Sequence, residues 1–411
     1  MSEDGPALGS KSRWQSTRAT IERRIVAPTL DLVRVGVSWV ARVMDQRGPV
    51  DRTLVVLLAI YVGGLALLGV PELRAAFPSG MDIEIPLRAA THWSTGAAVY
   101  PPSAMLVQHG PDLPYLYPPF LLPLLSPIAA LPRDLVTDLW LALCLVAAVW
   151  TCRRLGIPWI AVPFLLAWPP FLEGLIVGNV QILLFAAFVA VFYEPGKGAP
   201  EQRSLRPDRD LQNGVLATVV GALKVTQGLP VLYLARRRVR AALLGVAVVG
   251  LVAVATLPLT GIHIYGDWLA QLQRASDPAW TVGGVSLTHR YGIPDAVAIA
   301  AGVALALAVR GRDSVAWLGI ALLVATPSAH GYTFLFLLPA MLTIRRDIAI
   351  PLGALFLGNY HGYAWWLAWL LVTWTLMASS RWHWLRAPRR SEAHGRVPER
   401  PAAESREAPG V

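Results

Sequence analysis

Long apolar runs that contain no charged side chain constrain the fold of this sequence more than any other feature. Runs such as 54–70, 176–193 and 241–258 approach or reach the ~20 residues that an α-helix needs to cross the hydrocarbon core of a bilayer. Only 15% of the residues are charged, whereas soluble globular domains carry about 25%. The sequence therefore predicts an all-α polytopic membrane protein.

The region 53–378 divides into apolar segments, from which we expect about 10–12 spans and half-spans. Both ends of the chain are rich in arginine, so the positive-inside rule places both termini in the cytoplasm. An even number of complete crossings follows, and some segments must then cross only partly. The segments are 53–70, 117–131, 135–151, 157–170, 175–193, 211–234, 240–259, 294–309, 314–327, 330–344 and 350–378.

The segment 211–234 is the clearest candidate for a partial crossing. Arginines at 203–209 and 236–240 mark both of its flanks as cytoplasmic, yet it is too short to cross twice. We predict a re-entrant pair of half-helices that is broken near Lys224. An unpaired charge in an apolar stretch costs several kcal/mol, so Lys224 needs an anionic partner, a carboxylate or a ligand phosphate, unless it snorkels to an interface.

Two polar tails flank the transmembrane domain. Residues 1–52 form a basic cytoplasmic tail, in which 21–44 has the mixed apolar and basic pattern of an interfacial helix; a disordered tail is the alternative. Residues 379–411 read as a disordered cytoplasmic tail. The net charge of +10 fits cytoplasmic loops and anionic lipid headgroups, and we expect no nucleic-acid partner.

Asp82 lies in the first large polar loop, 71–117, next to a short amphipathic helix. Pro86 suits the first turn of such a helix, and Leu87, Ala90, Trp93 and Ala97 recur at helical spacing. A helix of this kind lies flat at the membrane surface and holds Asp82 at the level of that surface. The carboxylate then either performs chemistry at that surface or caps the helix N-terminus.

Further polar residues occur at places where an apolar bundle would open. Asn179 and Gln181 present amides in an apolar helix and suit either hydroxyl binding or interhelical packing. Pro327 and Gly331 predict a helix break around His330, which would aim its imidazole into a cavity; a structural histidine is the alternative. The second large loop, 260–294, adds aromatic and basic side chains such as Arg290, as expected for the wall of a sugar site.

Several short motifs follow one another in an order that resembles a known family. After the acid come a Gly-Ala-Ala-Val-Tyr stretch, a Tyr-Pro-Pro motif, a Gly-Asn-Val-Gln motif, a lysine, an arginine-rich turn and a Pro-Ser-Ala-His motif. In this order they are similar to polytopic GT-C glycosyltransferases of the family 87 type, the bacterial polyprenyl-phosphate-mannose-dependent mannosyltransferases. The similarity covers roughly 53–378, and the motifs lie at 82, 96–100, 117–119, 178–181, 224, 236–240 and 327–330.

Two departures from the family pattern leave the sugar and the acceptor open. Family members often have a tyrosine a few residues after the acid, where this chain has Pro86 and Leu87. The family's lysine usually has a proline soon after it, whereas Pro230 follows Lys224 by six residues.

The resemblance implies a GT-C-like helical bundle with a large first extracytoplasmic loop that carries the amphipathic helix. It implies a hexosyltransferase of the plasma membrane that moves mannose from a polyprenyl phosphate to a lipid or glycan hydroxyl outside the cytoplasm. Asp82 takes the place of the family's catalytic acid and would act as general base, and one such carboxylate predicts inversion. The expected binding residues are His330, Lys224, Arg88, Asn179, Gln181, Tyr117, Tyr332 and Arg290.

We expect no cofactor, because the phosphate leaving group already carries charge, although Asp82 and Glu84 together could ligate a divalent cation. The partners are then the polyprenyl-phosphate sugar, the acceptor and membrane lipids. A transporter or flippase of a lipid-linked sugar is the alternative function. Such proteins often show internal repeats, and this sequence shows none.

Overall fold

A computed structural model of the protein describes most of the residues between 79 and 344. The described residues are 79–106, 112–157, 159, 162–193, 207–224, 227–275, 284–309, 313–344 and part of 366–377. The expected tails 1–52 and 379–411, the helix at 21–44, the segment 53–70 and most of 350–378 lie outside them.

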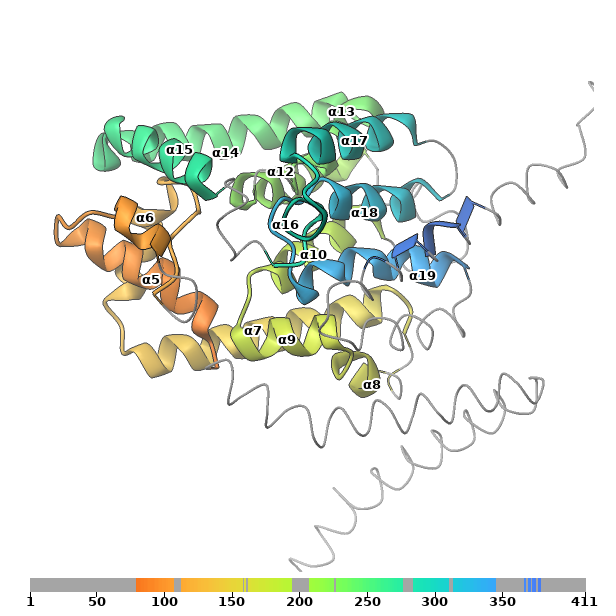
Figure 1. Ribbon diagram of the computed structural model, residues 1–411, viewed down its shortest axis with the longest axis horizontal. Coiled ribbons are helices and arrows are strands. Elements are labelled where there is room, and N and C mark those ends of the chain that lie inside the picture. Colours follow the sequence, from red (N-terminus) through yellow and green to blue (C-terminus); the bar gives the residue numbers. More distant parts are fainter. Residues whose placement is uncertain are drawn as a thin grey trace, which may run out of the picture.

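The described chain forms helices connected by short segments, apart from one isolated β-bridge between Gly284 and Ala329, so the expected all-α class is confirmed (Figure 1). The α-helices are α5 (Met81–Ser94), α6 (Leu121–Ala129), α7 (Arg133–Arg154), α8 (Val162–Leu166), α9 (Pro169–Val177), α10 (Gln181–Phe192), α12 (Asp210–Leu223), α13 (Leu229–Arg237), α14 (Val239–Thr260), α15 (His263–Ala275), α16 (Leu287–Tyr291), α17 (Asp295–Ala308), α18 (Ser314–Val324) and α19 (Leu338–Ile344). The 3-10 helices are η3 (Pro102–Leu106), η5 (Pro207–Arg209) and η8 (Gly331–Leu337).

Two helices, α7 and α14, have the length and the apolar composition that a membrane span requires, with 22 residues each. Helix α14 exposes much of its apolar surface: Leu243 is 64% exposed, Leu251 68% and Val254 65%. Soluble proteins rarely expose continuous apolar surface of this kind, whereas lipid tails solvate it. The exposed face of α14 therefore fits contact with lipid.

The buried core lies where α10 passes α18 and η8. Phe336 of η8 is fully buried and meets two rings of α10 edge-on, Phe185 at 5.5 Å and Phe188 at 5.2 Å between ring centroids. Edge-to-face pairs add about 0.5–1.5 kcal/mol each to the burial of the rings. These contacts hold η8, and with it the segment that begins at His330, against the centre of the bundle.

The segment 211–234 is broken as predicted. Helix α12 ends at Leu223, Lys224 has extended backbone angles, and α13 begins at Leu229. The break after α18 is also confirmed, because α18 ends at Val324 and η8 begins only at Gly331.

The prediction of one continuous helix over 175–193 is wrong. Helix α9 ends at Val177, Gly178 has a φ of 67°, and α10 begins at Gln181. A left-handed glycine ends a helix at low steric cost, so Asn179 lies in a turn between two helices and not inside one.

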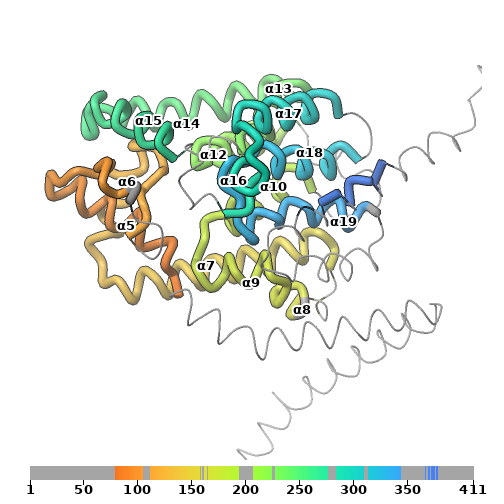
Figure 2. The backbone as a smooth tube through the Cα atoms, viewed as in Figure 1, coloured from red at the N-terminus to blue at the C-terminus, as the bar shows by residue number. Residues whose placement is uncertain are grey.

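Helix α5 also begins earlier than the sequence suggested. It starts at Met81, so Asp82 lies within its first turn and Pro86 in its interior. Because Pro86 has no N–H, the carbonyl of Asp82 lacks the helical hydrogen-bond partner that this position would otherwise provide. Figure 2 shows α5 and α6 together at one end of the molecule, with α18 and α19 toward the other.

Helices α12 and α14 approach each other closely where two glycines face the opposite backbone. A Cβ atom at Gly214 would overlap the carbonyl of Ala241 and lie 2.9 Å from the backbone nitrogen of Gly245. A Cβ at Gly245 would likewise overlap the backbone of Gly214. The small side chains permit this contact, as they do in other membrane helix pairs.

We predict that Gly214→Ala destabilises the protein by about 1–3 kcal/mol, because the added methyl group must push two backbones apart. Gly250→Ala is the matched control, since Gly250 also lies in α14 but a Cβ there meets open space. Thermal unfolding of the purified proteins in detergent measures the difference. Equal melting temperatures for the two variants would contradict the close packing of α12 on α14.

Candidate functional site

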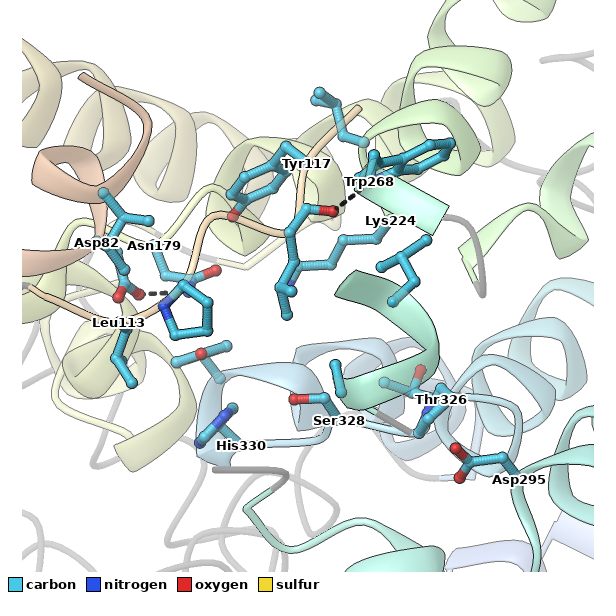
Figure 3. Close-up of a pocket in the computed structure, with 18 of the residues that line it drawn as sticks. Asp82, Leu113, Tyr117, Asn179, Lys224, Trp268, Asp295, Thr326, Ser328 and His330 are labelled. Carbon is cyan, nitrogen blue, oxygen red and sulfur yellow. Dashed lines mark hydrogen bonds between the residues drawn. The ribbon is translucent and has the colours of Figure 1, made fainter. Parts of the chain in front are cut away.

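A cavity of about 370 Å³ lies between α5, α15, α17 and the segment that follows α18. Its volume is at the small end of the usual range for ligand sites, roughly 300–1,000 Å³. Six of the residues singled out in the sequence line it: Asp82, Tyr117, Asn179, Lys224, His330 and Tyr332. Segments far apart in the chain thus bring an acid, a lysine and a histidine to one site (Figure 3).

The N-terminus of α5 is fixed against α9, and this contact places Asp82. The backbone N–H of Gly80 donates to the carbonyl of Ile176 at 2.9 Å. Gly80 has a φ of 73°, and a Cβ there would overlap the side chain of Thr137, so both the conformation and the space favour glycine. Asp82 is half-buried at the wall of the cavity.

Asn179 holds the carboxylate of Asp82. Its Nδ2 donates to Asp82 Oδ2 at 2.5 Å, and its Oδ1 accepts from the backbone N–H of Gln181 at 2.8 Å. The second bond assigns the orientation of the amide, with the NH₂ group toward the carboxylate. Helix α5 shows no side-chain cap, so the capping role considered for Asp82 is not the one observed.

Burial raises the pKa of Asp82 above its ordinary value of 3.8. The hydrogen bond from Asn179 and the positive charge of Lys224 act in the opposite direction and partly offset the effect of burial. Desolvation disfavours the charged form of a carboxyl, whereas a donated hydrogen bond favours it. A base whose pKa is raised in this way is a stronger proton acceptor than an exposed aspartate.

Lys224 is held by neutral groups. Its Nζ donates to Gln181 Oε1 at 2.9 Å and lies 5.4 Å from the centroid of the Tyr332 ring. Gln227 also donates to Gln181 Oε1, at 2.8 Å. Within the described chain Lys224 forms no salt bridge. We expected an anionic partner for it, and Asp82 meets this expectation only by a longer-range electrostatic interaction. The ammonium group therefore remains able to bind a ligand anion in the cavity.

His330 is positioned by the segments on both sides of it. Its ring stacks on Tyr332 at 5.3 Å between centroids, and its backbone N–H donates to Thr333 Oγ1 at 3.1 Å. The neighbouring Ala329 accepts a 2.6 Å backbone hydrogen bond from Val285. The predicted break thus turns His330 into the cavity (Figure 3).

Three of the expected binding residues do not line the cavity. Arg88 donates to Asp112 Oδ1 at 2.8 Å and to the carbonyl of Leu113 at 2.9 Å, and Leu113 itself lines the wall. Gln181 lies one layer behind Lys224. Arg290 is on α16, outside the lining residues.

Three residues near the site were missed in the sequence, Gln227, Glu173 and Asp295, whereas Trp268 is one of the aromatic residues expected from the loop 260–294. Gln227 completes the amide pair behind Lys224, and Trp268 donates to the carbonyl of Leu116 at 2.9 Å and lines the cavity. Glu173 accepts a hydrogen bond from the backbone N–H of Gly331. Asp295 lines the cavity. A lone acid in an apolar region such as that around Glu173 is a functional signal in membrane proteins and could have been noticed.

A comparison with known families gives one match. The sequence model of glycosyltransferase family 87 matches residues 115–329, slightly more than half of the chain. The matched region contains Asn179 and Lys224, begins after Asp82 and ends one residue before His330. No curated protein and no solved structure gives a significant match.

We predict that Asn179→Ala raises the pKa of Asp82 further, because the variant loses a hydrogen bond that Asn179 donates to the carboxylate. The direction is upward because the lost bond stabilises the ionised form. Infrared titration measures the carboxyl band of Asp82, which is identified by its absence in Asp82→Asn. Asn213→Ala, a change at another buried asparagine that does not line the cavity, should leave the titration unchanged. A fall in the pKa in Asn179→Ala would contradict the assigned bond.

Proposed function

Because the chain belongs to glycosyltransferase family 87, we propose that it transfers mannose from a polyprenyl phosphate to a hydroxyl of a lipid or glycan acceptor. The reaction takes place on the extracytoplasmic side of a bacterial plasma membrane, with both termini in the cytoplasm. One observation carries the proposal: an acidic group, Asp82, and two groups capable of binding phosphate, Lys224 and His330, line the same cavity.

The cationic side of the cavity suits the phosphate of the donor. A lysine ammonium has three donors, and Gln181 accepts from the Lys224 ammonium. The Tyr332 ring lies against both Lys224 and His330, so it sets the spacing of the two groups. Donors held in place before the reaction stabilise the charge that develops on a leaving group.

Asp82 suits the role of general base. In the proposed step the acceptor oxygen attacks the anomeric carbon while Asp82 removes its proton, and the bond from the anomeric carbon to the phosphate oxygen breaks. The phosphate leaves from the opposite face, so the configuration inverts. Glu173 does not line the cavity and is engaged by the backbone of Gly331. Asp295 lies on the opposite side of the cavity from Asp82 (Figure 3), so the proposed mechanism uses one active carboxylate.

The lipid parts of the substrates suit the apolar wall of the same cavity. Ile85, Leu116 and Leu272 line it together with Trp268, and such side chains accept an alkyl chain without loss of hydrogen bonds. No cofactor enters the proposed reaction, since the donor already carries its phosphate, Lys224 supplies positive charge and the His330 ring can donate a hydrogen bond. Membership of a glycosyltransferase family favours transfer over the transporter considered from the sequence.

We predict that Asp82→Asn lowers the rate of transfer by about 10²–10⁴-fold, the usual contribution of general-base catalysis. The assay uses purified protein in detergent with polyprenyl-phosphate mannose and a lipid-extract acceptor. Glu84→Gln is the matched control, because Glu84 lies in the same helix and does not line the cavity. Normal turnover by a folded Asp82→Asn protein would exclude Asp82 as the base.

A further inference from the structure

The cavity has a second polar end, which the proposed transfer chemistry does not use. Asp295 lies in the first turn of α17, and Thr326 and Ser328 lie in the segment after α18; all three line the cavity. In Figure 3 Asp295 and Thr326 lie on the opposite side of the cavity from Asp82 and Asn179. A ligand bound at Asp82 can therefore extend toward Asp295.

Asp295 is held at one oxygen only. The hydroxyl of Thr288, in α16, donates to Asp295 Oδ1. Asp295 Oδ2 is buried and has no hydrogen-bond partner among the described residues. Buried polar atoms in native proteins are nearly always paired, so a carboxyl group that lines the cavity with one oxygen unpaired has unused capacity to accept hydrogen bonds.

A role at the helix N-terminus alone does not explain this arrangement. Asp134 occupies the first turn of α7 and is exposed, so an acid can favour a helix dipole from solvent. Asp295 is instead turned to a cavity and tied to a second helix by Thr288. Its carboxyl group lines the cavity with its hydrogen-bonding capacity only partly used.

The charge of this end selects the kind of ligand. No described basic residue forms a salt bridge with Asp295, so this end repels phosphate, which Lys224 at the other end attracts. A carboxylate accepts hydrogen bonds from neutral hydroxyl groups, and its two oxygens can serve two of them. Trp268, in the wall of the same cavity, offers an aromatic face to a sugar ring.

We propose that Asp295, together with Ser328, binds adjacent hydroxyl groups of a sugar ring and so contributes to the choice of sugar. The inference rests on the proposed sugar transfer and deepens it. The sugar belongs either to the donor or to the acceptor, since both carry the same hydroxyl chemistry. The two sources differ in which substrate loses affinity when Asp295 is changed.

Steady-state kinetics of Asp295→Asn tests the assignment. Polyprenyl-phosphate mannose is the varied donor, and hexyl glycosides of mannose, glucose and galactose are the varied acceptors. We expect KM for one substrate to rise by roughly 10-fold or more, with a smaller change in kcat, because the lost contact is a hydrogen bond to a charged group. A rise for the acceptor assigns the site to the acceptor sugar, and a rise for the donor assigns it to the donor sugar. Unchanged KM values, or a loss confined to kcat, would overturn the proposal.

A binding measurement keeps this test separate from that of the transfer reaction. Saturation-transfer NMR with the same hexyl glycosides should detect binding to the Asp82→Asn protein, and the added change Asp295→Asn should abolish it. Asp134→Asn is the matched control for loss of an acid in a first helical turn, and it should leave the binding intact. If Asp295→Asn does not fold, Ser328→Ala should weaken the same binding.

The outcomes of the two tests are distinct. Binding that depends on Asp295, together with a wild-type protein that transfers no sugar, would refute the proposed reaction and keep the sugar site. Glycoside binding that is equal with and without the Asp295 carboxylate, or that is absent for all three sugars, would overturn the sugar site. Transfer by the wild-type protein would then still support the proposed function.

Discussion

The hydrogen bond from Asn179 to Asp82 joins two parts of the chain that are 97 residues apart, and the site depends on it. The junction needs two glycines: Gly80 begins α5 beside the end of α9, and Gly178 ends α9 so that Asn179 can turn toward the acid. A Cβ at Gly178 would lie 3.3 Å from the Cα of Gly80. The backbone thus brings the acid and its amide together, and Gln181 orients the amide.

The charged side chains of the cavity lie so that anion binding and hydroxyl binding would take place at different ends. Lys224 lies near Asp82 and donates to an uncharged amide, that of Gln181, which also accepts from Gln227. Its charge is therefore not neutralised by a salt bridge among the described residues. His330 is held on the Tyr332 ring. Because a low-dielectric wall strengthens the charge of Lys224, a few residues suffice to bind an anion at one end. At the other end Asp295 lines the cavity, where we propose that it binds neutral hydroxyls.

Local signals in the sequence predicted part of this arrangement. The breaks at Lys224 and before His330 were predictable, because a charge between two cytoplasmic flanks and a proline followed closely by a glycine both favour a helix break. The turn at Gly178 was not, since a single glycine inside an apolar run is compatible with an unbroken helix. The hydrogen bond that Glu173 accepts from Gly331 depends on the tertiary fold, and no pattern of spacing in one sequence specifies a partner so distant.

In the proposed reaction one carboxylate, Asp82, drives a single displacement at the anomeric carbon, and the stereochemistry of the product shows whether it does. NMR of the product formed by the purified wild-type protein compares the anomeric configuration of the new glycosidic bond with that of the donor. We predict opposite configurations. The same configuration in donor and product would contradict the account, because retention requires a second displacement and a nucleophile that forms a covalent intermediate.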